Sequence, residues 1–503
     1  MKTFPVGICL ALFLLIALSG QSVCAQTRPN VLFILSDDQR ADAVGASGNP
    51  YVHTPELDAL ARRGVTFTNA YCMGSHVGAV CAPSRAMLMS GRSLFHVYDT
   101  LAGVPTLPQT LRDNGYLTFG TGKWHNERSA FRAGFAQGKT IFFGGMSDHY
   151  QVPVVDMLPD GSFSEDTLRG FSTDVFTESA LSFLDDYAAG NRAKPFFAYV
   201  AYTAPHDPRS PAPDYIDRYA PEQLPLPPNF RATHPFDLGV MTIRDENLGA
   251  WPRTPEQIRE QLADYYGLVT HLDARIGDLL RALEDHNLAD NTIVVFTSDH
   301  GLAIGSHGLL GKQSLYEESM HSPLIMAGPG LARPGLARPG LPEQQTRDAL
   351  VYLYDLLPTL CGLVGVDPPP GIDGHDLSPI IRGEVPEVRN SLFTTYSTTQ
   401  RAVKNHRWKL IRYPAIGHTQ LFDLQNDPYE LNNLAQDSTH RAVRDRLWSE
   451  LERQQAQAGD TLSLRVANLA PMEYDLSDYD RQPDRHQPDY TLRKYFEEAA
   501  PPK

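Results

Sequence analysis

The amino-acid sequence predicts an α/β fold: a large, mostly parallel β-sheet sandwiched by helices, followed by a smaller C-terminal α+β domain with an antiparallel sheet. Short apolar runs alternate with longer helical segments over most of the chain, which is typical of an α/β sandwich. The apolar runs are nearly continuous, as in parallel strands that are covered on both faces. Beyond about residue 385 the pattern changes to short strand-like pieces, which indicates the second domain.

Four apolar runs are predicted to be strands of the large sheet, and each ends abruptly in polar residues. Ligands of such folds bind beyond the carboxyl ends of the strands, so the polar residues are expected at one rim of the sheet. The predicted strands and the polar segments that follow them are 30–35 with 36–39, 116–119 with 120–125, 195–202 with 203–208, and 292–297 with 298–301.

Helices are expected between and after these strands, at 55–63, 107–114, 172–187, 254–286 and 350–364. We assign residues 26–385 to the first domain and 386–503 to the second, with strands at 391–396, 409–413 and 420–424. The tail from about Pro471 has little to bury and is expected to wrap the surface or to be partly disordered. A tandem copy of Gly-Leu-Ala-Arg-Pro at 330–339 predicts a surface loop.

The first 25 residues are predicted to be a secretory signal peptide. Lys2 precedes an apolar run at 8–18, and small residues follow at 23–25, as at a cleavage site. The protein is therefore expected to be secreted or periplasmic, without stable membrane insertion. Cys72, Cys81 and Cys361 would remain in the mature chain, too few for a disulfide scaffold.

The formal net charge of −15 argues against nucleic acid as a partner, because no broad basic surface is available. An anionic substrate would have to be met by a local cluster of cationic side chains. The candidates for such a cluster are Arg85, Lys123, His125, His206 and Lys312.

The segment Cys81–Arg92 is the most informative part of the sequence. Pro83 suits the first turn of a helix, so Cys81 is expected just before a helix N-terminus, where the helix dipole favours an anion. Arg85 can project beside Cys81 as a bidentate anion clamp. A buried structural cysteine before an ordinary helix is the alternative, but it does not account for the whole segment.

This segment, Cys-Ala-Pro-Ser-Arg followed by Ala-Met-Leu-Met-Ser-Gly-Arg, resembles the signature of the formylglycine-dependent sulfatases. These are the type I sulfatases of the alkaline phosphatase superfamily, and the resemblance covers residues 28–435. It implies that a formylglycine-generating enzyme oxidises Cys81 to an aldehyde. The hydrated aldehyde would then be the nucleophile that attacks a sulfate ester.

Three carboxylates, Asp37, Asp38 and Asp299, stand at two predicted strand ends. Alone, the Asp37-Asp38 pair would suit a helix cap or a solvated turn. Together the three would repel one another without a hard divalent cation, and the resemblance implies that this cation is Ca²⁺, with His300 and residue 81 completing the shell. Many sulfatases have Asn at the position of His300, and imidazole is a softer ligand, so manganese or another divalent ion is the alternative.

The resemblance also implies roles for two lysines and two histidines. Lys123 would contact sulfate and aldehyde oxygens, and His125, two residues on, would act on the hydrated aldehyde. His206 would protonate the departing alcohol as a general acid. Lys312 would bind the bridging and terminal sulfate oxygens. The chain departs from the family at Asn126, where Leu-Gly is frequent.

The function expected from these motifs is a secreted sulfatase that acts on a sulfated carbohydrate. A phosphonate monoester or phosphodiester hydrolase of the same superfamily is one alternative, because both ester types are tetrahedral monoanions. A non-catalytic sulfated-glycan-binding protein is the other, and it predicts an unmodified Cys81. Further residues that could line the pocket are His76, His96, Trp124, His149 and Arg209.

Overall fold

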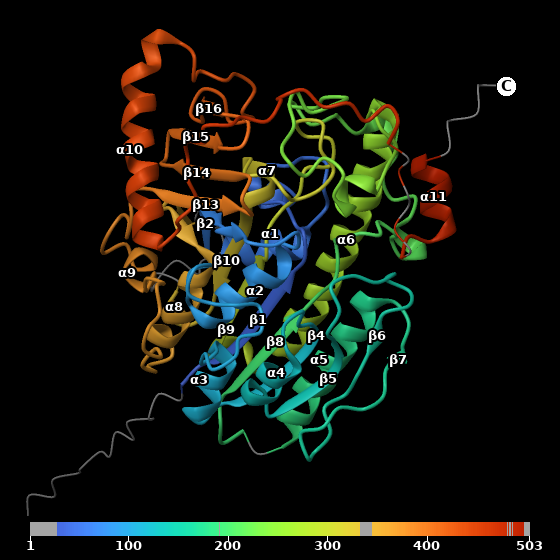
Figure 1. The fold of residues 1–503 in the computed structure, drawn as a ribbon. Helices are drawn as coiled ribbons and strands as arrows, with labels where there is room; N and C mark the ends of the chain where they lie inside the picture. The colour runs from blue at the N-terminus through green and yellow to red at the C-terminus, as the bar shows by residue number, and fades with distance from the viewer. Residues whose placement is uncertain are drawn as a thin grey trace, which may run out of the picture.

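The computed structural model describes residues 28–190, 192–331, 345–479, 481, 484 and 486–496 (Figure 1). The predicted signal peptide and most of the repeat at 330–339 lie outside the described residues. None of the helices in the described part combines the length and the apolar composition that crossing a bilayer would require.

A nine-stranded sheet of the described chain forms the centre of the molecule, in the order β11-β2-β10-β9-β1-β8-β4-β5, with β12 also paired to β2. The five strands from β9 to β5 are parallel to one another, whereas β10 is antiparallel to both β9 and β2. The predicted large, mostly parallel sheet is therefore confirmed. Its strands are β1 (Asn30–Ser36), β2 (Val65–Tyr71), β4 (Leu117–Lys123), β5 (Gln137–Phe142), β8 (Phe196–Ala201), β9 (Thr292–Ser298), β10 (His321–Ala327), β11 (Gln345–Arg347) and β12 (Val351–Tyr352).

Helices cover both faces of this sheet. Along β1, Phe33 and Leu35 pack into the core on one face, while Leu32 and Ile34 pack into the core on the other, because successive strand residues point to opposite sides. The first face is covered by α2 (Cys81–Ser90), α3 (Leu107–Asp113), α4 (Arg128–Gly134) and α8 (Leu356–Leu363), and the second by α1 (Pro55–Arg63), α5 (Ser172–Ala189) and α6 (Pro255–Asp285). A two-stranded sheet of β6 (Pro153–Val154) and β7 (Thr167–Leu168) lies beyond β5.

The predicted helix at 350–364 is wrong at its start. Val351 and Tyr352 form β12 beside β2, and α8 begins only at Leu356. The buried carboxylate of Asp355 accepts the Tyr352 N–H at 2.8 Å and a bidentate pair of bonds from Arg389. By binding the Tyr352 N–H, the Asp355 side chain marks the point at which strand β12 ends and the helical segment begins within a single apolar run of the sequence.

The second sheet of the described chain has the order β16-β15-β14-β13-β3, and four of its strands are antiparallel. The fifth, β3 (Gly74–Ser75), comes from the first domain and pairs with β13. Gly74 has φ +112°, and a Cβ there would lie 1.8 Å from the Thr395 carbonyl oxygen, so only glycine fits. The remaining elements are β13 (Leu392–Tyr396), β14 (Gln400–Lys404), β15 (Trp408–Tyr413), β16 (His418–Asp423), α7 (Glu317–Met320), α9 (Ser378–Ile381), α10 (Arg441–Ala458) and α11 (Asp489–Phe496).

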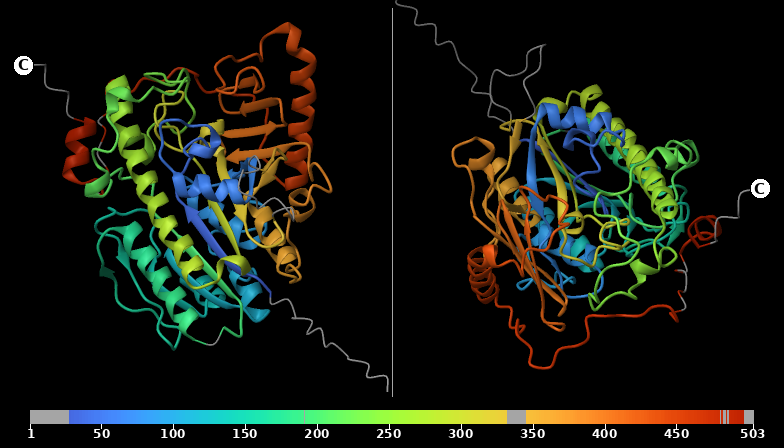
Figure 2. Two further views of the ribbon diagram at one scale, coloured as in Figure 1. Left: turned by 180° about the vertical axis from the view of Figure 1, so that it is seen from behind. Right: turned by 90° about the horizontal axis from the view of Figure 1, so that it is seen from above.

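After α10, the chain leaves the second sheet and crosses back over the first domain to α11, which lies beside α6 (Figure 2). The Tyr474 hydroxyl donates to the His234 carbonyl at 2.6 Å, and the Asp237 N–H donates to the Met472 carbonyl at 2.8 Å. The tail thus wraps the surface, which is one of the two alternatives predicted from the sequence.

Candidate active site

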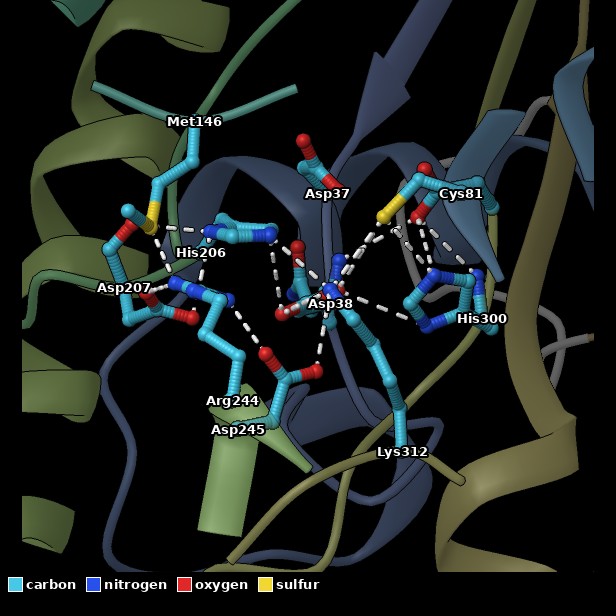
Figure 3. A network of polar contacts seen from close by, with 12 residues as sticks. Asp37, Asp38, Cys81, Met146, His206, Asp207, Arg244, Asp245, His300 and Lys312 are labelled. Atoms are coloured by element: carbon cyan, nitrogen blue, oxygen red, sulfur yellow. Dashed lines mark hydrogen bonds and ion pairs between the residues drawn. The ribbon is translucent and has the colours of Figure 1, made fainter. Parts of the chain in front are cut away.

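The carboxyl ends of four neighbouring strands bring the predicted polar residues to one rim of the large sheet (Figure 3). Asp37 and Asp38 follow β1, and Lys123 is the last residue of β4. His206 follows β8, and Asp299 with His300 follows β9. Because these strands are parallel neighbours, Asp38 and Asp299 become adjacent although they are 261 positions apart in the sequence.

Cys81 is the first residue of α2 and therefore belongs to the helix, whereas the sequence predicted that it would lie just before it. Its Sγ lies 3.1 Å from Nε2 of His300 and 3.2 Å from Nζ of Lys312, and its thiol faces Asp38 Oδ1 at 3.8 Å. Every residue of α2 is buried, so the helix is fixed by packing. Burial, reinforced by the charge of Asp37, raises the pKa of the Cys81 thiol well above its ordinary value, and an unmodified Cys81 is therefore neutral.

The carboxylates of Asp37, Asp38 and Asp299 are fully enclosed beside Cys81. Burial raises the pKa of Asp38 to about 6, and nearby Asp37 and Asp299 add to it. Within the described chain, Oδ1 of Asp37 is buried without a hydrogen-bond donor, which is costly unless a cation is present.

Two sets of donor atoms could hold a metal ion, each within a 4.8 Å span. The first combines Asp37, Cys81, Asp299 and His300, and the second combines Asp37, Asp38, Cys81 and His206. Nδ1 of His300 donates to the Gly301 carbonyl at 2.9 Å, so its Nε2 keeps a lone pair and faces Cys81. Oxygen-rich donors with one imidazole, together with the unpartnered Asp37 oxygen, fit a divalent cation.

Three cationic side chains lie among the three carboxylates. Lys123 Nζ contacts Asp37, and Lys312 Nζ donates to Asp38 at 2.8 and 3.0 Å. Arg85 Nε donates to Asp299 at 2.9 Å and Nη1 donates to the Lys123 carbonyl at 2.5 Å, whereas the buried Nη2 has no hydrogen-bond partner within the described chain. The guanidinium therefore holds a carboxylate of the site, and the predicted clamp on a substrate anion stays a prediction.

The backbone at the end of β4 aims Lys123 and His125. Gly122 has φ +85°, and a Cβ there would lie 1.8 Å from the Ala201 carbonyl oxygen, so glycine is required. His125 itself has φ +60°, a conformation that is uncommon for residues other than glycine. Asn126, where the chain departs from the family, donates to the carbonyls of Ala82 at 3.1 Å and Asp99 at 2.8 Å. It thereby ties this loop to the first turn of α2.

A cavity of about 470 Å³ opens above Cys81, with His125, His206 and Lys312 in its wall. Burial, with the charges of Lys123 and Arg85, lowers the pKa of His125 well below its ordinary value. Its Nδ1 is buried without a hydrogen-bond partner among the described residues, and the residue lines the cavity as a neutral imidazole.

His206 stands on the other side of Cys81 and is also held in one orientation. Its Nδ1 donates to the Asp207 carbonyl at 2.8 Å, and its Nε2 lies 2.9 Å from Lys312 Nζ. Burial and the charge of Lys312 lower the pKa of His206 well below its ordinary value. The Lys312 ammonium therefore donates to His206 Nε2, and both residues line the cavity.

The further pocket residues proposed from sequence lie elsewhere; in the described structure none of the five lines this cavity. Trp124 packs edge-on against Phe131 and Phe135. His149 supports the site from behind, because Nε2 donates to the His206 carbonyl at 2.9 Å. The others are outside it: Arg209 contacts Gln261, His96 pairs with Asp373, and His76 packs against Phe95.

Sequence reasoning missed the opposite wall of the cavity, which carries Arg244 and Asp245 from one loop and Asp484 and His486 from the C-terminal tail. These residues belong to no recognisable motif. The only local signal is the acidic and basic run at 244–246, which would ordinarily indicate a solvated turn. The other lining residues are Gly78, Ala79, Gly145, Met146, Ile243 and Gln313.

Comparison with known proteins agrees with the geometry. The model of the family described as Sulfatase matches residues 29–366, and that of the family described as N-sulphoglucosamine sulphohydrolase, C-terminal, matches residues 305–457. The ulvan-active sulfatase of Formosa agariphila is 31% identical over 479 residues, covering 89% of this chain and 85% of the relative. The N-acetylglucosamine-6-O-sulfatase of Bacteroides thetaiotaomicron is 27% identical, covering 86% and 87%. A protein solved in complex with its substrate D-glucosamine-2-N,6-O-disulfate has a TM-score of 0.71 at 25% identity, covering 86% of this chain and 99% of that one.

Proposed function

The chain belongs to the sulfatase family and is a sulfuric ester hydrolase, and from this premise we propose that it removes a sulfate group from a carbohydrate. Similar proteins are named for N-acetylglucosamine and for a disulfated glucosamine, which supports a sulfated sugar as substrate. The observation that carries the proposal is the position of Cys81. Its Sγ faces His300 and Lys312 inside a cavity that also holds His125 and His206.

We propose that Cys81 is oxidised to formylglycine by a formylglycine-generating enzyme and that the hydrated aldehyde is the nucleophile. One hydroxyl of residue 81 releases its proton to solvent as its oxygen bonds to sulfur, and the bond from sulfur to the leaving oxygen breaks. His206 delivers a proton from solvent to the departing oxygen, while Lys312, 2.9 Å from its Nε2, stays charged. Lys123 and Lys312 stabilise the negative charge on the sulfate oxygens, and Arg85 holds Asp299 in place.

The second half of the reaction frees the sulfate from residue 81. His125 takes the proton of the remaining hydroxyl, the bond between the residue 81 carbon and the sulfate oxygen breaks, and the aldehyde is restored. Addition of water then regenerates the hydrate. A neutral His125 with a free Nδ1 suits a proton acceptor. A serine or thiol nucleophile has no second hydroxyl on the same carbon, so it could not release sulfate in this way. Water would have to attack the sulfate ester itself.

Asp37, Asp38, Asp299, His300 and modified residue 81 are the groups that would hold a divalent ion. When bound, such an ion supplies charge neutralisation and lowers the pKa of the attacking hydroxyl. We propose Ca²⁺, with manganese or another divalent ion as the alternative that the His300 imidazole keeps open.

We further propose that residues 1–25 are a cleaved signal peptide and that the enzyme works outside the cytoplasm, as a secreted or periplasmic protein. The catalytic domain would span residues 26–385, and the subdomain with the antiparallel sheet and tail would span 386–503. The proposed catalytic residues that line the cavity, the last of which is Lys312, all lie within the first of these two domains, which supports this division.

The test is a comparison of sulfate release from an aryl sulfate and from defined sulfated mono- and disaccharides with hydrolysis of an aryl phosphodiester and a phosphonate monoester at matched pH. We expect higher kcat/KM for a sulfate ester. Faster turnover of the phosphodiester or phosphonate would replace the proposal with the superfamily alternative. An intact Cys81 and absence of all turnover in protein produced together with a formylglycine-generating enzyme would favour the glycan-binding protein.

A further inference from the structure

The wall of the cavity opposite the strand ends is built around a single arginine among the described residues. Arg244 lines the cavity and keeps 33% of its side chain exposed. Its Nε donates to Asp484 Oδ2 at 3.1 Å. Nη1 contacts Asp245, and Nη2 contacts Asp207 (Figure 3). Each nitrogen of the guanidinium is therefore already engaged by a carboxylate.

This arrangement leaves the wall acidic. Three aspartates surround one guanidinium. Lys312 lies 4.0 Å from Asp245 but donates to Asp38, and His206 Nδ1 lies 3.3 Å from Asp207 Oδ1. A substrate carboxylate placed here would have to displace an aspartate from Arg244 and would face the remaining negative charge. Sugar hydroxyls, in contrast, can donate to carboxylate lone pairs that Arg244 does not use.

The C-terminal tail holds Asp484 in this position. Tyr474 fixes the tail before Asp484 by donating to the His234 carbonyl at 2.6 Å. Lys494 and Tyr495 fix it afterwards, since both bind the buried carboxylate of Asp264, at 2.9 and 2.5 Å. A segment anchored on both sides of Asp484 makes the acidic wall a built part of the cavity.

We propose that Arg244, together with Asp207, Asp245 and Asp484, forms a leaving-group subsite for an uncharged, hydroxyl-bearing sugar and disfavours a hexuronate. The inference rests on the proposed function, because the leaving group is the alcohol of the sulfate ester. Asp484 then determines specificity although it lies 240 positions from Arg244 in the sequence.

The test is product-side inhibition of whichever sulfate ester the enzyme hydrolyses. The inhibitors are a methyl hexopyranoside and the methyl hexuronopyranoside that differs from it only by a carboxylate at C6, at constant ionic strength. We expect the neutral glycoside to have an inhibition constant at least about tenfold lower, because like charges at a binding surface disfavour association. In Asp484→Asn the ratio of the two constants should fall by about fivefold, since one negative charge is removed.

Asp475→Asn is the matched control, because Asp475 is exposed in the same segment and its hydrogen bonds among the described residues come from Ser477. It should leave the ratio unchanged. Equal inhibition by the two glycosides, inhibition by neither, or an unchanged ratio in Asp484→Asn would overturn the subsite. Absence of hydrolysis of every sulfate ester would instead overturn the proposed function, so the two failures are distinguishable.

Discussion

The two walls of the catalytic cavity are built in different ways. On one side, His206 lines the cavity, and the enclosed Asp37, Lys123 and Asp299 lie next to it. All four stand at or just after the carboxyl ends of parallel strands, so the topology of the sheet brings them together. On the other side, a loop near Arg244 meets the tail through Asp484. The difference suggests that the sulfate-binding chemistry is fixed by the core, whereas selection of the leaving group is added by peripheral segments.

Replacing the proposed nucleophile should have the largest effect and tests the side of the cavity that is built from the strand ends. We expect Cys81→Ala to lower kcat on any sulfate ester on the order of 10⁴-fold or more, because no hydroxyl remains to attack sulfur. Cys72→Ala is the control, since Cys72 is also buried but contacts Gly74. Comparable losses in both variants would show that the effect is structural.

Removing the metal ion should have the next largest effect. Exhaustive chelation is expected to lower kcat/KM by about 100-fold, and added Ca²⁺ should restore it. The thermal midpoint of unfolding should also fall, because Asp37, Asp38 and Asp299 repel one another without the ion. Asp299→Asn should weaken metal binding in titration calorimetry. Full activity and an unchanged midpoint after chelation would rule out the metal centre.

His206→Gln tests the junction of the two walls, because His206 bonds to Asp207, which in turn contacts Arg244. A lost general acid costs about 10² to 10⁴-fold, and the loss should be larger for a sugar sulfate than for an aryl sulfate, whose phenolate leaves without a proton. Rates on aryl sulfates of graded phenol acidity measure this dependence. A uniform loss across the series would assign His206 to binding alone.

The smallest effect is expected at the tail anchor. Tyr495→Phe removes the hydroxyl that donates to Asp264 at 2.5 Å, which should cost about 1–2 kcal/mol of unfolding free energy in urea titration. Aryl sulfate turnover should change less than about twofold, because the Tyr495 hydroxyl bonds to Asp264 and to the Arg209 carbonyl and not to the proposed catalytic residues of the described chain. A large loss of kcat with unchanged stability would mean that the walls are not separate.

The sequence was sufficient to predict the sheet, most helices and the proposed catalytic rim. An apolar run that ends in Asp, Lys or His indicates a buried strand, and the polar residue then lies at the strand's carboxyl end. It was less informative where one carboxylate decides the local structure, as Asp355 does between β12 and α8. Arg85 could be placed near Cys81, but not oriented, because its partners Asp299 and the Lys123 carbonyl become neighbours only in the fold. The same reason hid Arg244 and Asp484, whose contact joins segments with no shared pattern.

Mass spectrometry of the peptide that spans residue 81 tests the central claim most directly, because the proposed reaction requires an aldehyde there. The protein should be produced together with a formylglycine-generating enzyme and digested without reducing or alkylating agents. The account predicts a peptide in which the thiol sulfur and two hydrogens of Cys81 have been replaced by one oxygen, in proportion to sulfate-ester turnover. An intact Cys81 thiol in fully active enzyme would contradict it.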